Sequence, residues 1–556
     1  MSTKKRFSAS IKKIVFSGGN SFSIQPNEKV ILVGPNNSGK SQFLREILSI
    51  CQTGKYEQCN VVLNVVIAKT GAADDLRKFL DESGERVDGG YRYGDWSLHE
   101  SHIIYWNQPY IMHGLLNGFL KKISADNRLE ICKQQESITL GDQKTKPQHV
   151  LFDSEALMSR ISKLFKRAFG KDIMFDFRGG RHLPIHVGNI PMGDGMTDRV
   201  SDAYVAEVRK NALLDKQGDG MKSYAGILFE AVVANRDITL IDEPEAFLHP
   251  PQMRRLGETL SSEVAGQLVV ATHSSDILRG FLEGTKGSAR ILRIRREGDL
   301  NFVSEAAPDV IKELWEKPEL RYSNALESIF HEQAIICEDD SDCRLVNSVA
   351  DYLSTGVSPE WKDTSYVPTG GKHGVPKIAA VLRKIGVPVK VIFDIDFLAE
   401  RELVRSTVDA FGGDWAKVEP LWVRVDNAVR NGIKPKDSVE IKSEISQILT
   451  KDGLRKREIV DAMKQDKPWA EVKKYGKMGL PKGDAQSLYN ELKDNLEEIG
   501  VFLVPVGEIE NFCPDIGLHG PKFVTKLLSS VALSDNRLAE LRSFVETVHR
   551  GNHGRL

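Results

Sequence analysis

A glycine-rich octapeptide near the start of the chain has the composition of a phosphate-binding loop. The stretch GPNNSGKS fits the pattern G-x-x-x-x-G-K-[ST] at every fixed position. Its residues are Gly34, Pro35, Asn36, Asn37, Ser38, Gly39, Lys40 and Ser41. Glycines in such a loop let backbone N–H groups face phosphate oxygens at the start of a helix. We expect Lys40 to reach the β- and γ-phosphates of a nucleotide and Ser41 to ligate Mg²⁺.

Two later apolar stretches end in polar residues that suit triphosphate hydrolysis. In ITLIDEPEAFLHP, a mostly apolar strand precedes Asp242, expected in the magnesium shell, and Glu243, expected as the base for the attacking water. The stretch QLVVATHSSD places His273 where an apolar strand ends, in a position to sense the γ-phosphate. A lone strand-end acid or histidine is more often a structural residue. The glycine-rich loop upstream favours the catalytic interpretation.

Acidic residues in the C-terminal third follow three further apolar stretches. Glu338 follows AIIC, Asp394 and Asp396 follow VKVIF, and Glu508 and Glu510 follow FLVPV. If these stretches are parallel strands, the carboxylates gather at one edge of a sheet. Massed carboxylates repel one another unless cations neutralise them. We therefore expect one or two Mg²⁺ or Mn²⁺ ions here, in a site suited to phosphodiester cleavage by the two-metal route.

Composition limits the classes of protein that fit. The chain has 556 residues, 41% of them hydrophobic and 28% charged, which is typical of a globular protein of two to four domains. The net charge of −1 means that any nucleic-acid contact must come from a local patch. Six scattered cysteines without a CxxC pair argue against a zinc site and favour a reducing cytoplasm. No apolar run approaches the ~20 residues of a membrane span, so we expect no membrane contact.

The hydrophobic pattern predicts the elements that position these residues. SIKKIVF, SFSI and KVILVG have the pattern of strands, and QFLREILSI has helical spacing after the glycine-rich loop. The next core strand is expected only at residues 237–245, so residues 52–205 are interpreted as an accessory or dimerisation insertion, mainly helical. Within it, HIIYWNQ (102–108) is expected to be a core strand. We expect a boundary near residue 330, with one domain over 1–330 and a second, alternating strands and helices, over 331–556.

The N-terminal motifs together resemble ABC-type ATPases of the RecF, Rad50 and SMC branch, and particularly OLD-type (overcoming lysogenization defect) ATPases. The resemblance implies a signature loop, for which QGDGMKSYAGIL is the best match although it departs from LSGGQ. Gly218, Asp219 and Gly220 would then pin the γ-phosphate of ATP in an opposing subunit, so that the chain must dimerise. Gln108 is the candidate glutamine that contacts the magnesium ion or the water.

The C-terminal acids resemble the TOPRIM domain of topoisomerases, primases and OLD-family nucleases. Glu338 occupies the strand-end glutamate position, Asp394 and Asp396 form the D-x-D pair, and Asp342 matches the second acid of the first motif. Asp339 replaces the usual glycine, which leaves the geometry of that loop open. The family's late lysine is assigned to Lys482, with Lys477 as the alternative.

The resemblance implies an α/β fold in which an ABC-type P-loop ATPase domain with a helical insertion precedes a TOPRIM-like α/β domain. It implies a cytoplasmic, ATP-binding, Mg²⁺- or Mn²⁺-dependent endonuclease, with DNA favoured over RNA, that acts in anti-phage defence as Gabija-, retron- and PARIS-type effectors do. A homodimer or larger homo-oligomer, and a partner protein or RNA from a defence operon, are expected. The alternatives are a tRNA-cleaving effector, and a RecF- or SMC-like sensor ATPase that acts through a partner.

Overall fold

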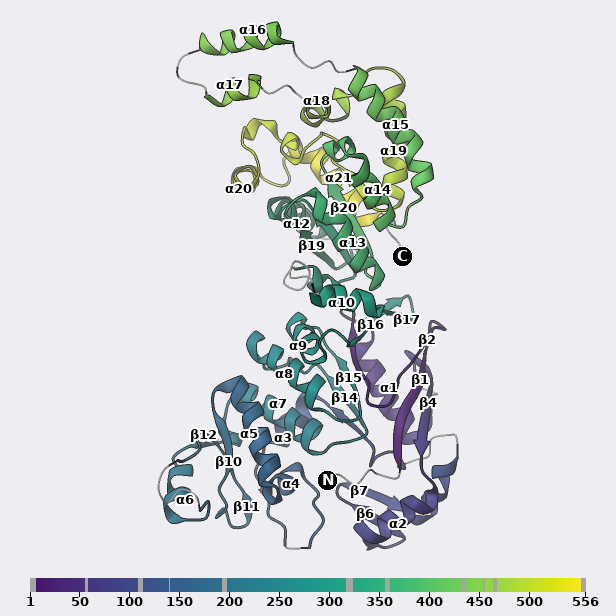
Figure 1. The fold of residues 1–556 in the computed structure, drawn as a ribbon, viewed down its shortest axis with the longest axis vertical. Coiled ribbons are helices and arrows are strands. Elements are labelled where there is room, and N and C mark those ends of the chain that lie inside the picture. The colour runs from purple at the N-terminus through teal and green to yellow at the C-terminus, as the bar shows by residue number, and fades with distance from the viewer. Residues whose placement is uncertain are drawn as a thin grey trace. The chain divides into compact units, whose positions relative to one another are not determined.

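The computed structural model describes most of the chain, which divides into two compact units, Met1–Tyr322 and Ser323–Leu556 (Figure 1). The described residues are 7–55, 59–108, 114–139, 141–192, 198–316, 324–355, 361–432, 437–451, 453, 456–463 and 468–551. Each unit is an α/β structure, as the sequence predicted. None of the helices in these ranges has both the length and the apolar character needed to cross a lipid bilayer.

A six-stranded sheet forms the centre of the first unit, in the order β17-β16-β3-β15-β14-β8. All neighbours are parallel except β16 and β17. Its strands are β3 (Lys29–Val33), β8 (Leu120–Ile123), β14 (Ile238–Asp242), β15 (Gln267–Ala271), β16 (Arg290–Glu297) and β17 (Leu300–Glu305). β3, β14 and β15 are almost wholly buried, which is why they appear in the sequence as continuous apolar runs.

An antiparallel sheet of the same unit has the order β2-β1-β4. Its strands are β1 (Ser8–Phe16), β2 (Ser21–Ser23) and β4 (Val62–Thr70). Helix α1 (Lys40–Thr53) contacts β4 as well as β14 and β15, so it lies between the two sheets. Helices α8 (Pro250–Glu263) and α9 (Ser275–Thr285) pack on each other, on the side of the parallel sheet away from α1 (Figure 1).

Smaller elements complete the first unit. Its remaining strands are β5 (Glu85–Val87), β6 (Gly90–Tyr93), β7 (Trp96–His99), β9 (Gln135–Glu136), β10 (Asp172–Phe175), β11 (His182–Leu183), β12 (Ile185–Gly188) and β13 (Ala212–Leu213). Its remaining helices are α2 (Ala73–Ser83), α3 (Ala125–Glu130), α4 (Pro147–Asp153), α5 (Glu155–Phe169), α6 (Asp202–Val208), α7 (Asp219–Ile227) and α10 (Pro308–Glu316).

The segment 52–205 differs from the expected insertion in two ways. It contains strands as well as helices. Two of its strands belong to the core sheets, since β4 pairs with β1 and β8 pairs with β14. The prediction of a core strand at HIIYWNQ is wrong, because Glu100–Asn107 is a 3₁₀ helix. Ile103 and Trp106 are buried three residues apart while Ile104 is exposed. That spacing fits three residues per turn rather than the alternation of a strand.

A four-stranded parallel sheet forms the centre of the second unit, in the order β19-β18-β20-β21. Its strands are β18 (Gln333–Cys337), β19 (Thr364–Pro368), β20 (Val389–Phe393) and β21 (Val501–Leu503). Helices α12 (Asp340–Ser354), α20 (Pro521–Ser530) and α21 (Ala539–Arg550) share one hydrophobic core with this sheet. Because all strands run the same way, their carboxyl ends share one edge of the sheet.

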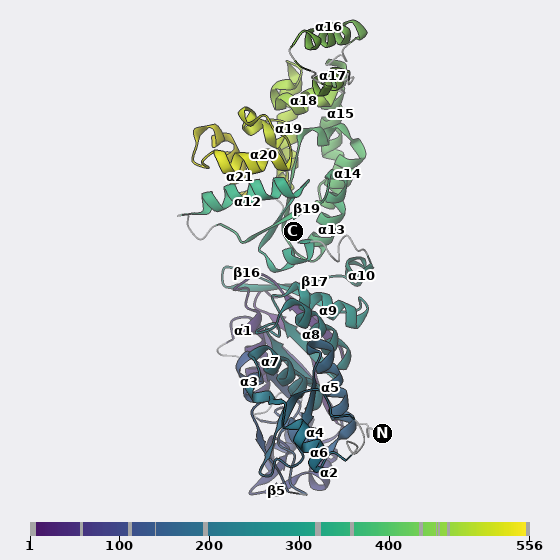
Figure 2. The ribbon, with the colours of Figure 1, turned by 90° about the vertical axis from the view of Figure 1, so that its left-hand side faces the viewer.

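The other helices of the second unit follow β19 and β20. α13 (Val375–Lys384) joins β19 to β20. In the sequence, a long helical segment follows β20 and precedes β21, and Figure 2 labels its helices. That segment comprises α14 (Arg401–Ala410), α15 (Trp415–Gly432), α16 (Ser438–Leu449), α17 (Lys456–Met463), α18 (Pro468–Tyr475) and α19 (Asp484–Glu498). α18 contacts the 3₁₀ turn Ile395–Ala399 that follows β20, so this segment returns to the carboxyl edge of the sheet.

Candidate functional sites

The glycine-rich loop lies between β3 and α1, as a phosphate-binding loop requires. Gly34 has φ 142°, and a Cβ there would lie 2.2 Å from the carbonyl oxygen of Ile294, so only glycine fits. Lys40 Nζ donates to the carbonyl oxygens of Gly34 and Pro35, at 2.7 Å each. Burial lowers the pKa of Lys40 to about 8. The loop thus curls around a buried lysine next to the N-terminus of a fourteen-residue helix.

The two predicted magnesium ligands of the ATPase unit are in contact. Ser41 Oγ donates to Asp242 Oδ1 at 2.9 Å, although the two residues are 201 positions apart. Lys122, at the end of β8, places Nζ 3.6 Å from Asp242 Oδ2. The hydroxyl and the carboxylate form the donor pair that Mg²⁺ takes beside a nucleotide in P-loop proteins, so these residues fit the ion.

The acid after Asp242 lies in a constrained turn. Glu243 has φ 46°, an unusual value for a residue other than glycine, and its N–H donates to the carbonyl of Ala271. Arg128, fully buried on α3, donates through Nη2 to the carbonyl oxygens of Glu243 and Ala246 at 3.0 and 3.3 Å. Sequence reasoning missed this arginine, because no motif marks a lone basic residue on a short helix.

His273 lies at the end of β15, beside the same turn. Its backbone N–H donates to Glu245 Oε1 at 2.6 Å, and Thr272 Oγ1 donates to Glu245 Oε2 at 2.8 Å. Burial and the neighbouring Lys40 charge lower the pKa of His273 to about 4. The imidazole is therefore neutral at pH 7 and can accept or donate one hydrogen bond near Lys40.

The predicted signature residues begin α7. Gly218 caps the helix, and the carboxylate of Asp219 pairs with Lys222 at 2.7 Å. A Cβ at Gly220 would lie 2.8 Å from the carbonyl oxygen of Phe247, so the first turn of α7 packs tightly on the loop after β14. Gln108 follows the 3₁₀ helix Glu100–Asn107, which packs on α2, β6 and β7. The roles of these four residues in ATP binding remain predictions.

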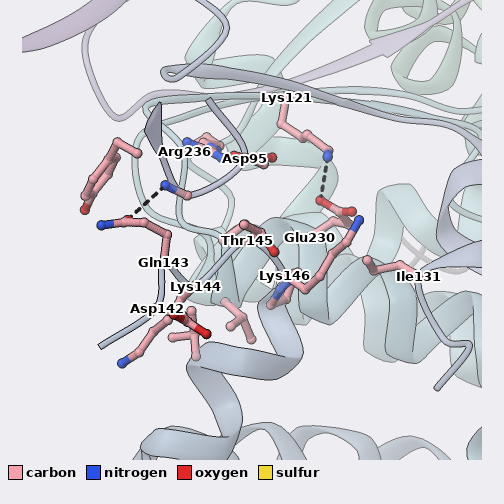
Figure 3. Close-up of a pocket in the computed structure, with 16 residues that line it drawn as sticks. Asp95, Lys121, Ile131, Asp142, Gln143, Lys144, Thr145, Lys146, Glu230 and Arg236 are labelled. Carbon is pink, nitrogen blue, oxygen red and sulfur yellow. Dashed lines mark hydrogen bonds and ion pairs between the residues drawn. The ribbon is translucent and has the colours of Figure 1, made fainter. Parts of the chain in front are cut away.

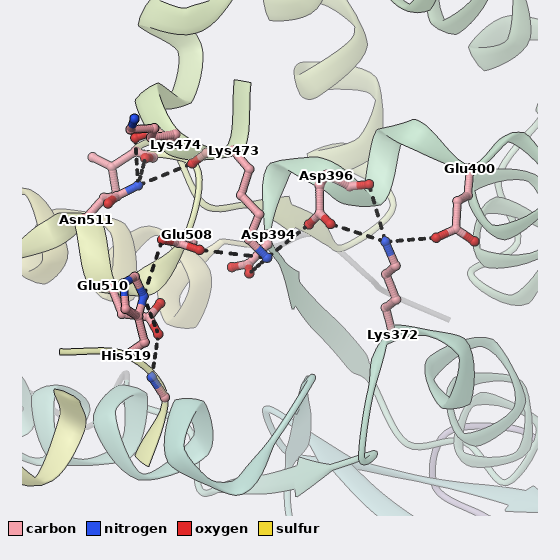
Figure 4. A network of polar contacts seen from close by, with 12 residues as sticks. Lys372, Asp394, Asp396, Glu400, Lys473, Lys474, Glu508, Glu510, Asn511 and His519 are labelled. Carbon is pink, nitrogen blue, oxygen red and sulfur yellow. Dashed lines mark hydrogen bonds and ion pairs between the residues drawn. The ribbon is translucent and has the colours of Figure 1, made fainter. Parts of the chain in front are cut away.

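The acids of the second unit converge at the carboxyl edge of its sheet (Figure 4). Glu338 directly follows β18, and Asp394 directly follows β20. Lys473 on α18 connects the acids, since its Nζ lies 2.7 Å from Asp394 Oδ2, 3.4 Å from Asp396 Oδ1 and 3.9 Å from Glu508 Oε2. The structure thus brings together acids from three separate stretches of sequence.

Burial and mutual repulsion raise the pKa values of these carboxyls. The pKa of Glu338 rises to about 7, through burial and then the charges of Asp394 and Asp396. Burial and the charge of Asp339 raise the pKa of Asp342 to about 8, and burial raises that of Asp394 to about 6. Burial alone would lower the pKa of Lys473, but the surrounding carboxylates outweigh it and hold the pKa above its ordinary value. The site favours positive charge.

A divalent cation fits this donor set. Glu338 Oε1 is buried and has no hydrogen-bond partner among the described residues, so it can accept a ligand bond without losing another contact. Carboxylate oxygens are the ligands that Mg²⁺ and Mn²⁺ prefer. The residues that would hold such ions include the predicted ligands Glu338, Asp342, Asp394, Asp396, Glu508 and Glu510.

Asp339, where the TOPRIM pattern has glycine, caps α12. Its Oδ1 accepts hydrogen bonds from Ser341 N and Asp342 N, at 2.6 and 3.2 Å. The backbone of Asp339 is extended, with φ −139°, so the position does not need the conformational freedom of glycine. The loop between Glu338 and Asp342 therefore keeps both acids close to Asp394, whose charge contributes to both raised pKa values.

The lysine in contact with the acids is not the one chosen from the sequence. Lys482 and Lys477 are both exposed, on the segment that leads into α19. Lys473, in the same basic stretch, contacts the acids, and Lys372 after β19 contacts Asp396 Oδ2 at 3.4 Å. The geometry therefore supports Lys473 in place of Lys482.

Comparison with known proteins finds one family model in each of the two units. The family model described as "AAA domain, putative AbiEii toxin, Type IV TA system" matches residues 144–279, which include Asp242, Glu243 and His273. The model described as "Overcoming lysogenization defect protein-like, TOPRIM domain" matches residues 329–396, which include Glu338, Asp342, Asp394 and Asp396. No curated protein matches the sequence.

Similar solved structures include heads of SMC proteins. The SmcHead bound to the C-winged helix domain of ScpA shares 14% identity over 53% of this chain and 97% of that chain, with a TM-score of 0.33. The SMC head domain from Thermotoga maritima shares 10% identity over 53% and 99%, with a TM-score of 0.28. Because these TM-scores are below 0.5, the fold assignment rests on the family models and the strand order.

The two units thus define an ATPase joined to a TOPRIM-type domain. The order of the two matches is that of an OLD-family ATPase with a C-terminal TOPRIM domain, and it confirms the resemblance found in the sequence.

Proposed function

We propose that this protein is an ATP-regulated, metal-dependent endonuclease that cleaves DNA in anti-phage defence. The observation that carries the proposal is the convergence of Glu338, Asp394 and Glu508 around Lys473 at one sheet edge. A structural acid cluster has little reason to bury a carboxylate oxygen without a partner, as Glu338 does. Cleavage of a phosphodiester needs cations for the attacking and leaving oxygens, and this cluster supplies their ligands.

The chain's own residues have distinct roles in this proposal. Mg²⁺ or Mn²⁺, when bound, polarises the phosphate and lowers the pKa of a bound water. Lys473 neutralises Asp394 and Asp396 and holds a non-bridging phosphate oxygen as a charged donor. Lys372, paired with Asp396 and Glu400, orients the aspartate from the other side.

In the ATPase unit, the backbone of the loop 34–39 and Lys40 bind the triphosphate, and Ser41 and Asp242 hold its magnesium ion. Glu243 takes the proton of the attacking water, and Arg128 holds the backbone of its turn by donating to the Glu243 carbonyl. ATP then joins two chains through Gly218, Asp219 and Gly220 of the partner, so the active form is a homodimer or a larger homo-oligomer. The cytoplasm, where ATP and phage DNA meet, is the proposed location, and a protein or RNA of the same operon is the proposed trigger.

The substrate is tested by incubating the full-length protein, Mn²⁺ and ATP with plasmid DNA and with tRNA in parallel. We expect nicked or linear plasmid and intact tRNA. Because the catalytic groups act on the phosphodiester that both substrates share, this comparison is what distinguishes them. Cleavage of tRNA alone would establish the RNA-cleaving alternative. Intact substrates under every condition would favour a sensor ATPase that acts through a partner.

A further inference from the structure

Glu508 faces two different groups of charges. Its Oε2 lies 3.9 Å from Lys473 Nζ, on the side of Asp394, whereas its Oε1 lies 3.8 Å from Nδ1 of His519 (Figure 4). The same imidazole nitrogen lies 3.9 Å from Glu510 Oε1. Glu508 therefore belongs both to the cluster around Lys473 and to a second group, which consists of Glu508, Glu510 and His519.

The spacing of this second group is close to the spacing that one cation requires. One donor atom from each of the three residues lies within 4.8 Å of the other two. Two atoms bound to the same ion at about 2.1 Å can lie at most about 4.2 Å apart. Both imidazole–carboxylate distances, 3.8 and 3.9 Å, already meet that limit.

The backbone around these donors is constrained. A Cβ on Gly507 would lie 1.9 Å from the carbonyl oxygen of Lys473, and its φ is 98°, so the turn before Glu508 requires glycine. Asn511 Nδ2 donates to the carbonyls of Lys473, Lys474 and Val506 at 3.0–3.2 Å. Gly520 N–H donates to Glu510 Oε1 at 2.7 Å and orients that carboxylate. The Gly520 contact reaches a proposed ligand directly, and contacts of that kind tune a metal site.

The donor types indicate which cation fits. The acids around Lys473 offer oxygen alone, which suits Mg²⁺, whereas the second group adds an imidazole nitrogen. Imidazole binds first-row transition ions more tightly than it binds Mg²⁺, and because Mn²⁺ is the weakest binder of that series, its preference over Mg²⁺ is the smallest that the imidazole gives. His519 is exposed (61% of its side chain), so an ion can enter from solvent.

We propose that Glu508, Glu510 and His519 form a distinct cation position that prefers a first-row transition ion such as Mn²⁺ to Mg²⁺, and that His519 sets this preference. The inference deepens the proposed function and rests on it, because Glu508 and Glu510 also belong to the proposed nuclease site. It adds a ligand and a metal selectivity that the acids alone do not give.

The test measures binding to the full-length protein without nucleic acid. Mn²⁺ is titrated and its free concentration followed by electron paramagnetic resonance, and Mg²⁺ is titrated by calorimetry. We expect His519→Ala to weaken Mn²⁺ binding at one position by about tenfold or more and to leave Mg²⁺ affinity unchanged. His519→Asp, which replaces nitrogen by oxygen, should shift the preference of that position towards Mg²⁺.

His373→Ala is the matched control, because His373 is also exposed (72%) and also faces an acid, at 3.6 Å from Glu400. It should bind both ions as the wild type does, and circular dichroism should show all variants folded. Unchanged Mn²⁺ affinity in His519→Ala, or an equal loss for both ions, would overturn the inference while leaving the proposed nuclease site intact. If the wild type bound neither ion, the metal-dependent function would fail as well.

Discussion

Three carboxyls at the edge of the second sheet have pKa values far above those of ordinary acids. They belong to Glu338, Asp342 and Asp394, at about 7, 8 and 6. Their shared cause is burial, followed by repulsion between neighbouring charges. A divalent cation removes both penalties once the acids are ionised, so cation binding and proton release are coupled.

This coupling predicts that Mg²⁺ binds more tightly as the pH rises from 6 to 8. A raised folded pKa means that the folded protein holds more protons than the unfolded chain between about pH 4 and 8, so the metal-free protein loses stability as pH rises through that window. At pH 6 Mg²⁺ must displace those protons, and at pH 8 it displaces fewer. We expect at least roughly tenfold tighter binding at pH 8, measured by calorimetry in two buffers that differ in ionisation enthalpy. Affinity independent of pH would contradict the raised pKa values.

The acids could be predicted from sequence, but their lysine could not. Glu338 and Asp394 directly follow recognisable apolar strands, and Glu508 comes shortly after a third, so the topology of parallel strands is enough to bring them together. Lys473 reaches the site only because α18 folds back onto the turn after β20, and nothing in the basic stretch 473–483 distinguishes it from Lys477 or Lys482. The sequence around His519 likewise contains no motif that marks it as a ligand.

At the scale of elements, Asp339 illustrates how a departure from a family pattern is accommodated. It caps α12 through Ser341 N and Asp342 N, while its charge contributes to the raised pKa of Asp342. Asp339 therefore stabilises α12 and makes Asp342 harder to ionise.

We predict that Asp339→Ala lowers the free energy of unfolding of the second unit by about 1 kcal/mol, whereas Asp339→Gly costs only a few tenths. Both changes should weaken Mg²⁺ binding, because they remove a nearby negative charge that attracts a divalent cation more strongly than it attracts the proton of Asp342. Denaturant unfolding and calorimetry measure the two effects. Asp340→Ala is the control, since Asp340 is in the same turn but is exposed and pairs with Arg344. Equal stability of all three variants would show that the cap contributes nothing.

Element prediction succeeded for the strands with strong local patterns and failed for those without one. KVILV, ITLID and QLVVA are buried on both faces, and their apolar runs identify them. β8 has the sequence LKKI, with two lysines in a four-residue strand, so its pairing with β14 is visible only in the structure. Lys121 and Lys122 are accommodated there by Glu230 and Asp242.

β8 also contributes to a pocket of about 390 Å³ in the first unit, lined by Lys121, Lys144, Lys146, Glu230 and Arg236 among others (Figure 3). Three of its cations are paired, Lys121 with Glu230 at 3.0 Å, Lys144 with Asp153 at 2.6 Å, and Arg236 with Asp95. The pocket is thus a mixed-charge surface rather than a concentrated anion site.

Across the whole molecule, the two candidate sites lie in separate compact units. Each site could be predicted from local motifs, which is why the order ATPase then TOPRIM was clear from the sequence and is confirmed by the family models. The effect of one site on the other is a coupling free energy, which local motifs do not encode. Only a measurement on the intact chain reports it.

The most direct measurement of the central claim is a cleavage assay on plasmid DNA with Mg²⁺ or Mn²⁺, with and without ATP, for wild type, Asp394→Ala and Glu243→Gln. We expect metal-dependent cleavage by the wild type and at least about a hundredfold loss in Asp394→Ala. Glu243→Gln should abolish ATP hydrolysis, leave the acids of the second unit intact and hold cleavage at its ATP-bound level. Equal cleavage by wild type and Asp394→Ala, in a preparation with matched purity, would contradict the assignment of the nuclease site.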